Sequence, residues 1–158
     1  MFVSDQVPLA AGFGAAKAGL AAVSRGGSLA GVSEAAYGEG IAALARAAPP
    51  GSVPSASRLV EVHFRDLVQR DDRAGLALRW QAAGPGGGMF PVLDADITLT
   101  PAGEHTTLLT LAGTYRPPLG ALGGGLDRAI LHRVAAATIR AFLSRIADAI
   151  VHPPASAA

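Results

Sequence analysis

Cysteine is absent from the 158-residue chain, lysine occurs once, and large aromatic side chains are few. The absence of cysteine excludes disulfides, thiolate zinc sites and a cysteine nucleophile. The first eight residues lack the basic start of a signal peptide, and the Ala/Gly stretch after them carries Lys17 and no strongly apolar core. No run approaches the roughly 18 apolar residues of a membrane-spanning helix. We therefore expect a cytoplasmic protein with no membrane span.

Charged residues are sparse and balanced in sign. Thirteen basic and 12 acidic residues give a net charge of +1, and they are spread along the chain without a polybasic stripe or an acidic tail. All basic residues except Lys17 are arginine, a bias that we attribute to the codon usage of a GC-rich genome rather than to phosphate recognition. Nucleic acid is therefore not an expected partner.

Motifs for metal, nucleotide or hydrolytic chemistry are missing as well. The four histidines are scattered without an i, i+4 pair or a His-Glu-x-x-His spacing, which disfavours a metal site. The glycine-rich run 120–125 lacks the Gly-Lys-Ser/Thr ending of a phosphate-binding loop, and we interpret it as a hinge before a helix. No serine lies in a Gly-x-Ser-x-Gly elbow. We expect no cofactor and no metal.

The length fits one domain, for which we predict the bounds 1–152, with a flexible tail over 153–158. Residues 2–9 can form a first strand. The alanine-rich stretch 12–24 is expected to be a helix that ends at the glycines following it. The segment 33–48 stays open between helix and strand, because its glycines weaken a helix and its alanines weaken a strand. The proline-rich stretch after it predicts a loop.

From residue 57 onward the hydrophobic period changes to two, which is typical of half-buried antiparallel strands. In the strand 59–65, the apolar face carries Val60, Val62 and Phe64. A turn at 70–73 then leads to a second strand at 75–81, which completes a predicted hairpin.

Two further alternating strands are expected at 90–100 and 106–115, where Gly113 predicts a bulge or a bend. Asp94 and Asp96 share a face of the first of these strands and could in principle do acid-base work. We interpret them instead as solvated charges paired with arginines of neighbouring strands, Arg65 or Arg79.

The C-terminal segment 126–151 is the longest predicted element, an amphipathic helix. Six residues spaced three or four apart form one apolar stripe along it, which is typical of a helix that packs on a sheet. These residues are Leu131, Val134, Thr138, Phe142, Ile146 and Ile150.

The order of these elements resembles the START-like, or SRPBCC, superfamily. The resemblance is carried by the hairpin ending in Leu78–Trp80, the strand Phe90–Pro101, the strand Thr107–Tyr115 with the Arg-Pro-Pro-Leu-Gly that follows it, and the helix from Leu126. It implies an α+β helix-grip fold, in which a curved antiparallel sheet wraps around a long C-terminal helix, with short N-terminal helices. It also implies an apolar ligand between the sheet and the helix, because members of that family bind lipids, sterols and polyketides there. No shared catalytic motif defines the family, so the resemblance assigns no catalytic residue.

The leading hypothesis is a protein that binds a small apolar ligand in a cavity between the sheet and the C-terminal helix. The candidate cavity residues are the large or polar side chains expected along that space: Phe64, Trp80, Phe90, Ile97, Tyr115, Arg116, Leu131, Val134, Thr138 and Phe142. One alternative is an enzyme of the polyketide cyclase, aromatase or dehydrase type, for which His132, Tyr115 and Arg116 are the candidate acid-base groups. A second alternative is a protein-interaction module without a ligand, and a homodimer is also considered.

Overall fold

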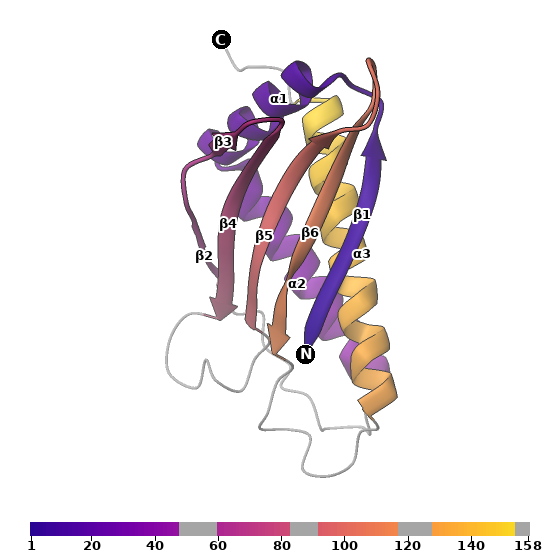
Figure 1. Cartoon of the computed structure of the whole chain (residues 1–158). Helices are drawn as coiled ribbons and strands as arrows, with labels where there is room; N and C mark the ends of the chain where they lie inside the picture. Colours follow the sequence, from indigo (N-terminus) through magenta and orange to yellow (C-terminus); the bar gives the residue numbers. More distant parts are fainter. Residues whose placement is uncertain (48–59, 83–91, 117–127, 154–158) are drawn as a thin grey trace.

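The structure is a computed structural model that describes residues 1–47, 60–82, 92–116 and 128–153. In these ranges one curved antiparallel sheet of six strands carries three helices on the same face (Figure 1). The predicted α+β class, with a curved antiparallel sheet around a long C-terminal helix, is therefore confirmed. The strands are β1 (Phe2–Leu9), β2 (Val60–Phe64), β3 (Val68–Arg70), β4 (Arg73–Ala82), β5 (Val92–Pro101) and β6 (Thr107–Arg116), and the helices are α1 (Phe13–Arg25), α2 (Ser28–Ala47) and α3 (Arg128–Val151).

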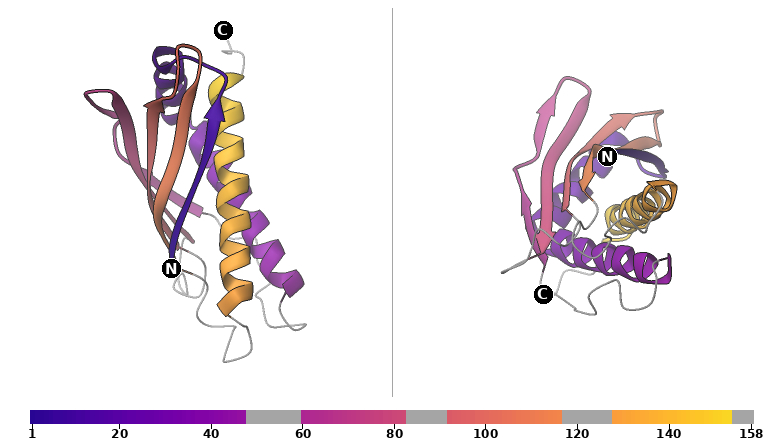
Figure 2. Two further views of the ribbon diagram at one scale, coloured as in Figure 1. Left: turned by 45° about the vertical axis from the view of Figure 1, so that its right-hand side comes forward. Right: turned by 90° about the horizontal axis from the view of Figure 1, so that it is seen from below.

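The strands follow the order β1-β6-β5-β4-β2, and β3 also pairs with β4. Period-two burial assigns each residue to a face, because successive side chains of a strand point to opposite sides of the sheet. The concave face is apolar and carries Leu78 on β4, Ile97 on β5 and Leu111 on β6, all buried. In the right-hand view of Figure 2, the sheet curls around α3, and α2 passes α3 on the lower side of the picture.

The predicted hairpin contains one feature that the alternation did not reveal. Phe64 pairs with Leu78 and Val68 pairs with Gly75, so residues 65–67 stand opposite only two residues of β4. This extra residue is a β-bulge, and it reverses the facing of the strand. Phe64 consequently faces the concave side while Val68 faces the convex side. The turn itself, Arg70–Arg73, lies where it was expected, with Asp71 at φ 50°.

Gly113 is not a bulge, since the pairing of β6 with β5 and with β1 runs past it without a change of register. The glycine is instead required by a close approach of the neighbouring strand. A Cβ at this position would lie 2.3 Å from the carbonyl oxygen of Asp94. Gly113 therefore lies inside a continuous ladder, where the neighbouring strand leaves no room for a side chain.

The segment left open between helix and strand is a helix, α2, and it begins at Ser28. Two glycines, Gly38 and Gly40, weakened the prediction of a helix, and the position of Gly40 explains why the segment is helical. A Cβ on Gly40 would lie 2.8 Å from Oγ1 of Thr138 on α3, so the two helices cross at this point with no room for a side chain. Gly38 faces open space. Packing of α2 on α3 thus outweighs the weak helix propensity of glycine.

The C-terminal helix is confirmed, with α3 described from Arg128 to Val151; residues 126–127 lie outside the described ranges. Its buried surface is wider than the predicted stripe. A second row (Ala135, Ile139, Leu143 and Ala147) is also buried, because the sheet covers one side of α3 while α1 and α2 cover another. An ion pair between Arg140 and Asp5 on β1, with Nε and Oδ2 3.2 Å apart, ties the helix to the edge strand.

Candidate functional site

A row of concave-face residues crosses the sheet one step from the end where β4 stops and β5 begins. Val62, Trp80, Leu93 and Tyr115 are consecutive partners in this row, and the backbone N–H of Tyr115 donates to the carbonyl of Met1. Trp80 and Tyr115 are both almost fully buried. The alternation of three strands thus brings the only tryptophan of the chain and one of its two tyrosines onto the same end of the concave face.

Helices supply the other side of this end. The Phe142 ring of α3 stacks on the Trp80 ring, with centroids 5.4 Å apart and planes 18° from parallel. Tyr37 of α2 meets the same indole edge-on, with centroids 5.7 Å apart and planes at 69°. Such contacts contribute about 0.5–1.5 kcal/mol each beyond the burial of area. We call these four residues, Tyr37, Trp80, Tyr115 and Phe142, the aromatic end.

The aromatic end contains polar atoms in an apolar surrounding. Nε1 of Trp80 is buried and has no hydrogen-bond acceptor among the described residues. Burial raises the pKa of the Tyr115 phenol well above its ordinary value, and the nearby Tyr37 raises it further. Tyr115 therefore stays protonated at any physiological pH and can act as a hydrogen-bond donor, not as a base.

The aromatic end lies close to one end of the sheet. Val60 pairs with Ala82, and Val92 pairs with Arg116, so all four strand ends lie together one or two residues beyond the row of Trp80 and Tyr115. The first turns of α3 extend past this edge of the sheet (Figure 1).

The predicted cavity residues fall into three groups. Trp80, Ile97, Tyr115, Val134, Thr138 and Phe142 are buried on the helix-covered side of the sheet, and Leu131 is half-buried. Phe64 is 36 % exposed on the edge strand, and Arg116 is exposed on the convex face, opposite in direction to its neighbour Tyr115. Phe90 lies outside the described residues.

Thr138 is buried one helical turn before Phe142, where α3 crosses α2. Its hydroxyl donates to the carbonyl of Val134, with a distance of 2.8 Å, and its side chain contacts Gly40 of α2. The contribution of Tyr37, in contrast, was missed. A period of three to four, shared by the buried residues Leu29, Ser33, Ala36, Tyr37 and Gly40, was the available signal, but the two glycines obscured it.

The other polar candidates lie on the surface. Asp94 and Asp96 are exposed on the convex face, and Arg79 pairs with Asp94 at 3.2 Å, as the interpretation of solvated charges predicted. His132 on α3 is exposed. Among the described residues, no cluster of histidine and acidic side chains could hold a metal ion.

Clefts of measurable volume open elsewhere on the described surface. A groove of about 400 Å³ separates α2 from the start of α3 and is lined by Ala43, Ile130, Arg133, Val134 and Ala137. A second, of about 280 Å³, continues it past Glu39 and Arg46. A third, of about 470 Å³, lies beside β3 and β4. No helix in the described ranges is long and apolar enough to cross a membrane.

Comparison with known proteins adds evidence on the fold. No protein-family model matches the chain, and no curated protein matches it. A conserved protein from Geobacillus kaustophilus of known structure is 14 % identical, with 95 % of each chain covered and a TM-score of 0.53. A hypothetical protein from Helicobacter pylori is 14 % identical over 93 % of this chain and 86 % of that one, with a TM-score of 0.49. An aromatase/cyclase from Streptomyces sp. R1128 is 14 % identical over 95 % of both chains, with a TM-score of 0.29. The first similarity shows a shared fold alone, and the TM-scores of the other two are too low to support a conclusion. Membership of the START-like superfamily therefore stays a prediction.

Proposed function

We propose that the protein binds a small, planar, mostly apolar molecule with a hydrogen-bond acceptor, at the aromatic end of its concave face. The Trp80 indole carries the proposal: it is 1 % exposed, and its N–H finds no acceptor among the described residues. An unpaired buried donor costs about 1–3 kcal/mol, so it requires an explanation. A ligand carbonyl that accepts this hydrogen bond would offset the cost.

The surroundings of Trp80 favour a flat ligand. The indole and the Phe142 ring lie nearly parallel, and the apolar neighbours Val62 and Leu93 flank the indole on the same face of the sheet. Planar rings stack on such surfaces, while the protonated phenol of Tyr115 adds a second donor. A fused-ring ketone satisfies both requirements. The ligand would approach from the end where the strands β2, β4, β5 and β6 begin or end.

A matched pair of probes tests the role of the acceptor. The ketone 2-acetylnaphthalene and the hydrocarbon 2-ethylnaphthalene have nearly the same shape, so only the first can accept from Trp80. Because the chain has one tryptophan, a ¹H–¹⁵N spectrum contains one indole N–H signal. We expect the ketone to move this signal downfield and to bind about tenfold more tightly than the hydrocarbon.

Two variants separate this proposal from unspecific apolar binding. Trp80→Phe keeps an aromatic ring without the N–H and should lose most of the preference for the ketone. Phe2→Leu changes an exposed aromatic residue of the convex face and should leave the preference for the ketone intact. Equal affinity of the wild-type protein for the two probes would contradict the proposal. Native mass spectrometry of freshly purified protein, where a retained extra mass is expected, gives an independent measurement.

The polyketide cyclase or dehydrase alternative depends on Tyr115. His132 and Arg116 are exposed and lie outside the aromatic end, which leaves the buried phenol as the single one of the three candidates placed there. Its raised pKa keeps the phenol protonated, which suits donation of a hydrogen bond to a substrate carbonyl and not proton abstraction. Turnover of a poly-β-ketone thioester by the wild-type protein, lost in Tyr115→Phe with binding retained, would establish this function; absence of turnover by the wild-type protein would exclude it for that substrate.

The third hypothesis, an interaction module, requires a contiguous apolar surface. Three large hydrophobic residues are exposed in the described ranges: Phe2, Phe64 and Val68. Phe2 lies on the edge strand β1, and the other two lie at the opposite edge of the sheet, on either side of the bulge. The described surface therefore gives this hypothesis no support.

A further inference from the structure

The convex face of the sheet, which no described helix covers, has a hollow at its β3–β4 corner. The cleft there has a volume of about 470 Å³ and contacts residues of β3, β4, β5 and the bulge. Its floor is low because Gly75 and Ala77 occupy consecutive convex-face positions of β4, between Val68 on β3 and Thr98 on β5. Since neighbouring strands lie about 4.8 Å apart, Val68 and Thr98 are separated by about 10 Å, which is room for one aromatic ring or alkyl chain.

Three arginines line this hollow: Arg65, Arg70 and Arg73. Arg70 and Arg73 are directly opposite each other in the ladder, an arrangement in which like charges repel. None of the three forms an ion pair with any residue of the described ranges, unlike Arg79 at the other end of the same strand, which pairs with Asp94. An anion between Arg70 and Arg73 would relieve their repulsion and accept charge-assisted hydrogen bonds from both.

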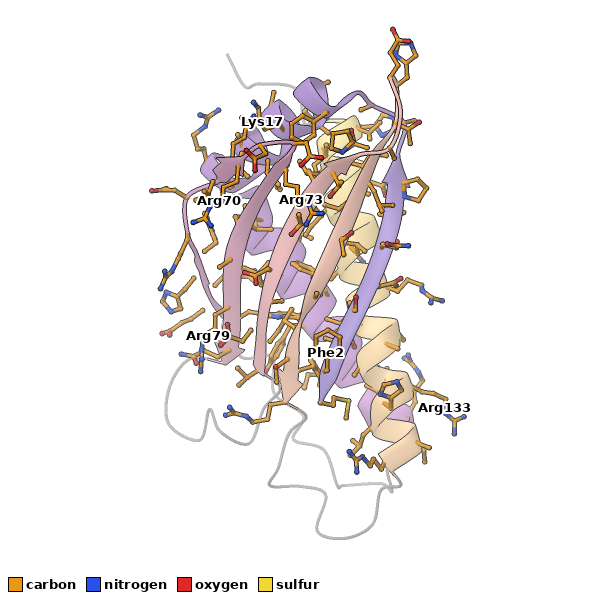
Figure 3. The ribbon with its side chains drawn as sticks, viewed as in Figure 1. Phe2, Lys17, Arg70, Arg73, Arg79 and Arg133 are labelled. Carbon is orange, nitrogen blue, oxygen red and sulfur yellow. The ribbon has the colours of Figure 1, made fainter. Side chains whose placement is uncertain are left out.

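The acidic residues around the corner define the polarity of the hollow. Asp71 and Asp72 form the turn but do not line the cleft, whereas Asp66 and Asp96 do. Asp96 is the direct partner of Ala77, so it lies about 13 Å along the strand from Arg73, given a rise of about 3.3 Å per residue. Of the two acidic residues that line the cleft, Asp96 is therefore distant from Arg70 and Arg73, and Asp66 belongs to the bulge. Figure 3 shows both of these arginines, with Lys17 of α1, at the opposite end of the sheet from Arg79.

We propose that this hollow is a binding site for a small organic anion, a carboxylate or phosphate attached to a narrow apolar body. The anionic group lies between Arg70 and Arg73, and the body lies over Gly75 and Ala77 between Val68 and Thr98. The site is separated by the thickness of the sheet from the aromatic end, so it is independent of the function proposed above.

Titration of the ¹⁵N-labelled full chain with phenyl phosphate tests the site. We expect saturable shifts of the amide signals of Gly75, Ala77 and Thr98. Inorganic phosphate, which lacks the apolar body, should bind about tenfold more weakly. A parallel titration with phenylacetate compares a carboxylate with a phosphate. The probe that binds more tightly identifies the anionic group that the site prefers.

Matched variants locate the charge and the body. Arg73→Gln should weaken phenyl phosphate binding about tenfold, while Arg79→Gln, on the same strand and the same face, should change it less than about twofold. Ala77→Ile fills the hollow and should weaken binding similarly. Its control, Ala112→Ile, places the same side chain on the convex face two strands away and should have no effect.

Three results would overturn the proposal. Equal weakening by Arg73→Gln and Arg79→Gln would mean that only general surface charge attracts the probe. Equal affinity for phenyl phosphate and inorganic phosphate would show that the hollow does not contact the body. Absence of saturable shifts with both aromatic anions would exclude the site. Because all four substituted residues lie on the convex face, outside the buried core, the variants are expected to fold.

Discussion

The crossing of α2 and α3 at Gly40 makes a sharp prediction, because a second glycine of the same helix provides a control. Gly38 and Gly40 are two residues apart, and alanine is favoured over glycine in a helix by about 0.8–1.0 kcal/mol. A Cβ on Gly38 meets nothing within 4 Å. A Cβ on Gly40 would lie 2.8 Å from Oγ1 and 3.1 Å from Cγ2 of Thr138.

Thr138 cannot give way easily, because it is buried and its hydroxyl donates to the carbonyl of Val134. Overpacking of this kind costs about 1–3 kcal/mol. With a cost of about 2 kcal/mol against a propensity gain of about 1 kcal/mol, Gly40→Ala should lower the free energy of unfolding by about 1 kcal/mol. Gly38→Ala should raise it by about 1 kcal/mol. For a chain of this size, each change corresponds to about 2–4 °C in Tm, in opposite directions.

Urea denaturation of the two variants measures the difference, and a double-mutant cycle with Thr138→Ala identifies its cause. Removal of the threonine side chain removes the clash, so Gly40→Ala should become stabilising in the Thr138→Ala background. The coupling between the two sites should be about 2 kcal/mol. If Gly40→Ala stabilised the wild-type protein as much as Gly38→Ala does, α2 would not contact α3 at this point and the arrangement of the two helices would be refuted.

Three further predictions concern the core, the turn and the buried phenol. Phe142→Ala removes a fully buried ring that stacks on Trp80, and it should lower the free energy of unfolding by about 3–5 kcal/mol in urea denaturation. Asp71→Gly relieves a left-handed backbone conformation at φ 50°, so it should stabilise the protein slightly, whereas Asp71→Val should destabilise it; thermal unfolding distinguishes the two. Because the pKa of Tyr115 is raised on folding, its contribution to stability is complete below its ordinary pKa of about 10 and is lost as the pH rises above that value. Urea denaturation at about pH 8 and about pH 11 should therefore show a smaller loss of stability for Tyr115→Phe than for the wild-type protein.

The strands and the C-terminal helix could be predicted from the sequence because each has a one-sided burial pattern. Alternation assigned Leu78, Trp80 and Ile97 to one face without knowledge of the partners, and the structure places all three there. The same rule cannot locate the bulge, since one extra residue reverses the facing and leaves no mark on composition. Val68 is consequently exposed although it is apolar.

The helix α2 could not be predicted because its stability depends on a contact that is distant in sequence. Gly40 appears unfavourable until its neighbour is known to be Thr138, about a hundred residues later. The same limit applied to the candidate site. Trp80, Tyr115 and Phe142 were predicted from their size and position, but Tyr37 belongs to the helix that was left open. Arg116 was predicted to lie beside Tyr115 in the cavity, although the alternation of a strand points these two neighbours to opposite faces. The hollow at Gly75 and Ala77 could not be predicted either, because it forms where these two residues have little or no side chain and the neighbouring strands carry larger ones.

The pairing of the first strand with the last has a consequence for synthesis and folding. Phe2 pairs with Thr114, so β1 cannot form a ladder until more than a hundred further residues have been made. At the roughly 5–20 residues per second of translation, the nascent strand waits for at least several seconds with both edges unpaired. Its exposure to aggregation during that interval is limited by Asp5 and Pro8, a charge and a residue without a backbone donor. We therefore expect refolding to be slow for a domain of this length, with the β1–β6 pairing among the last contacts to form.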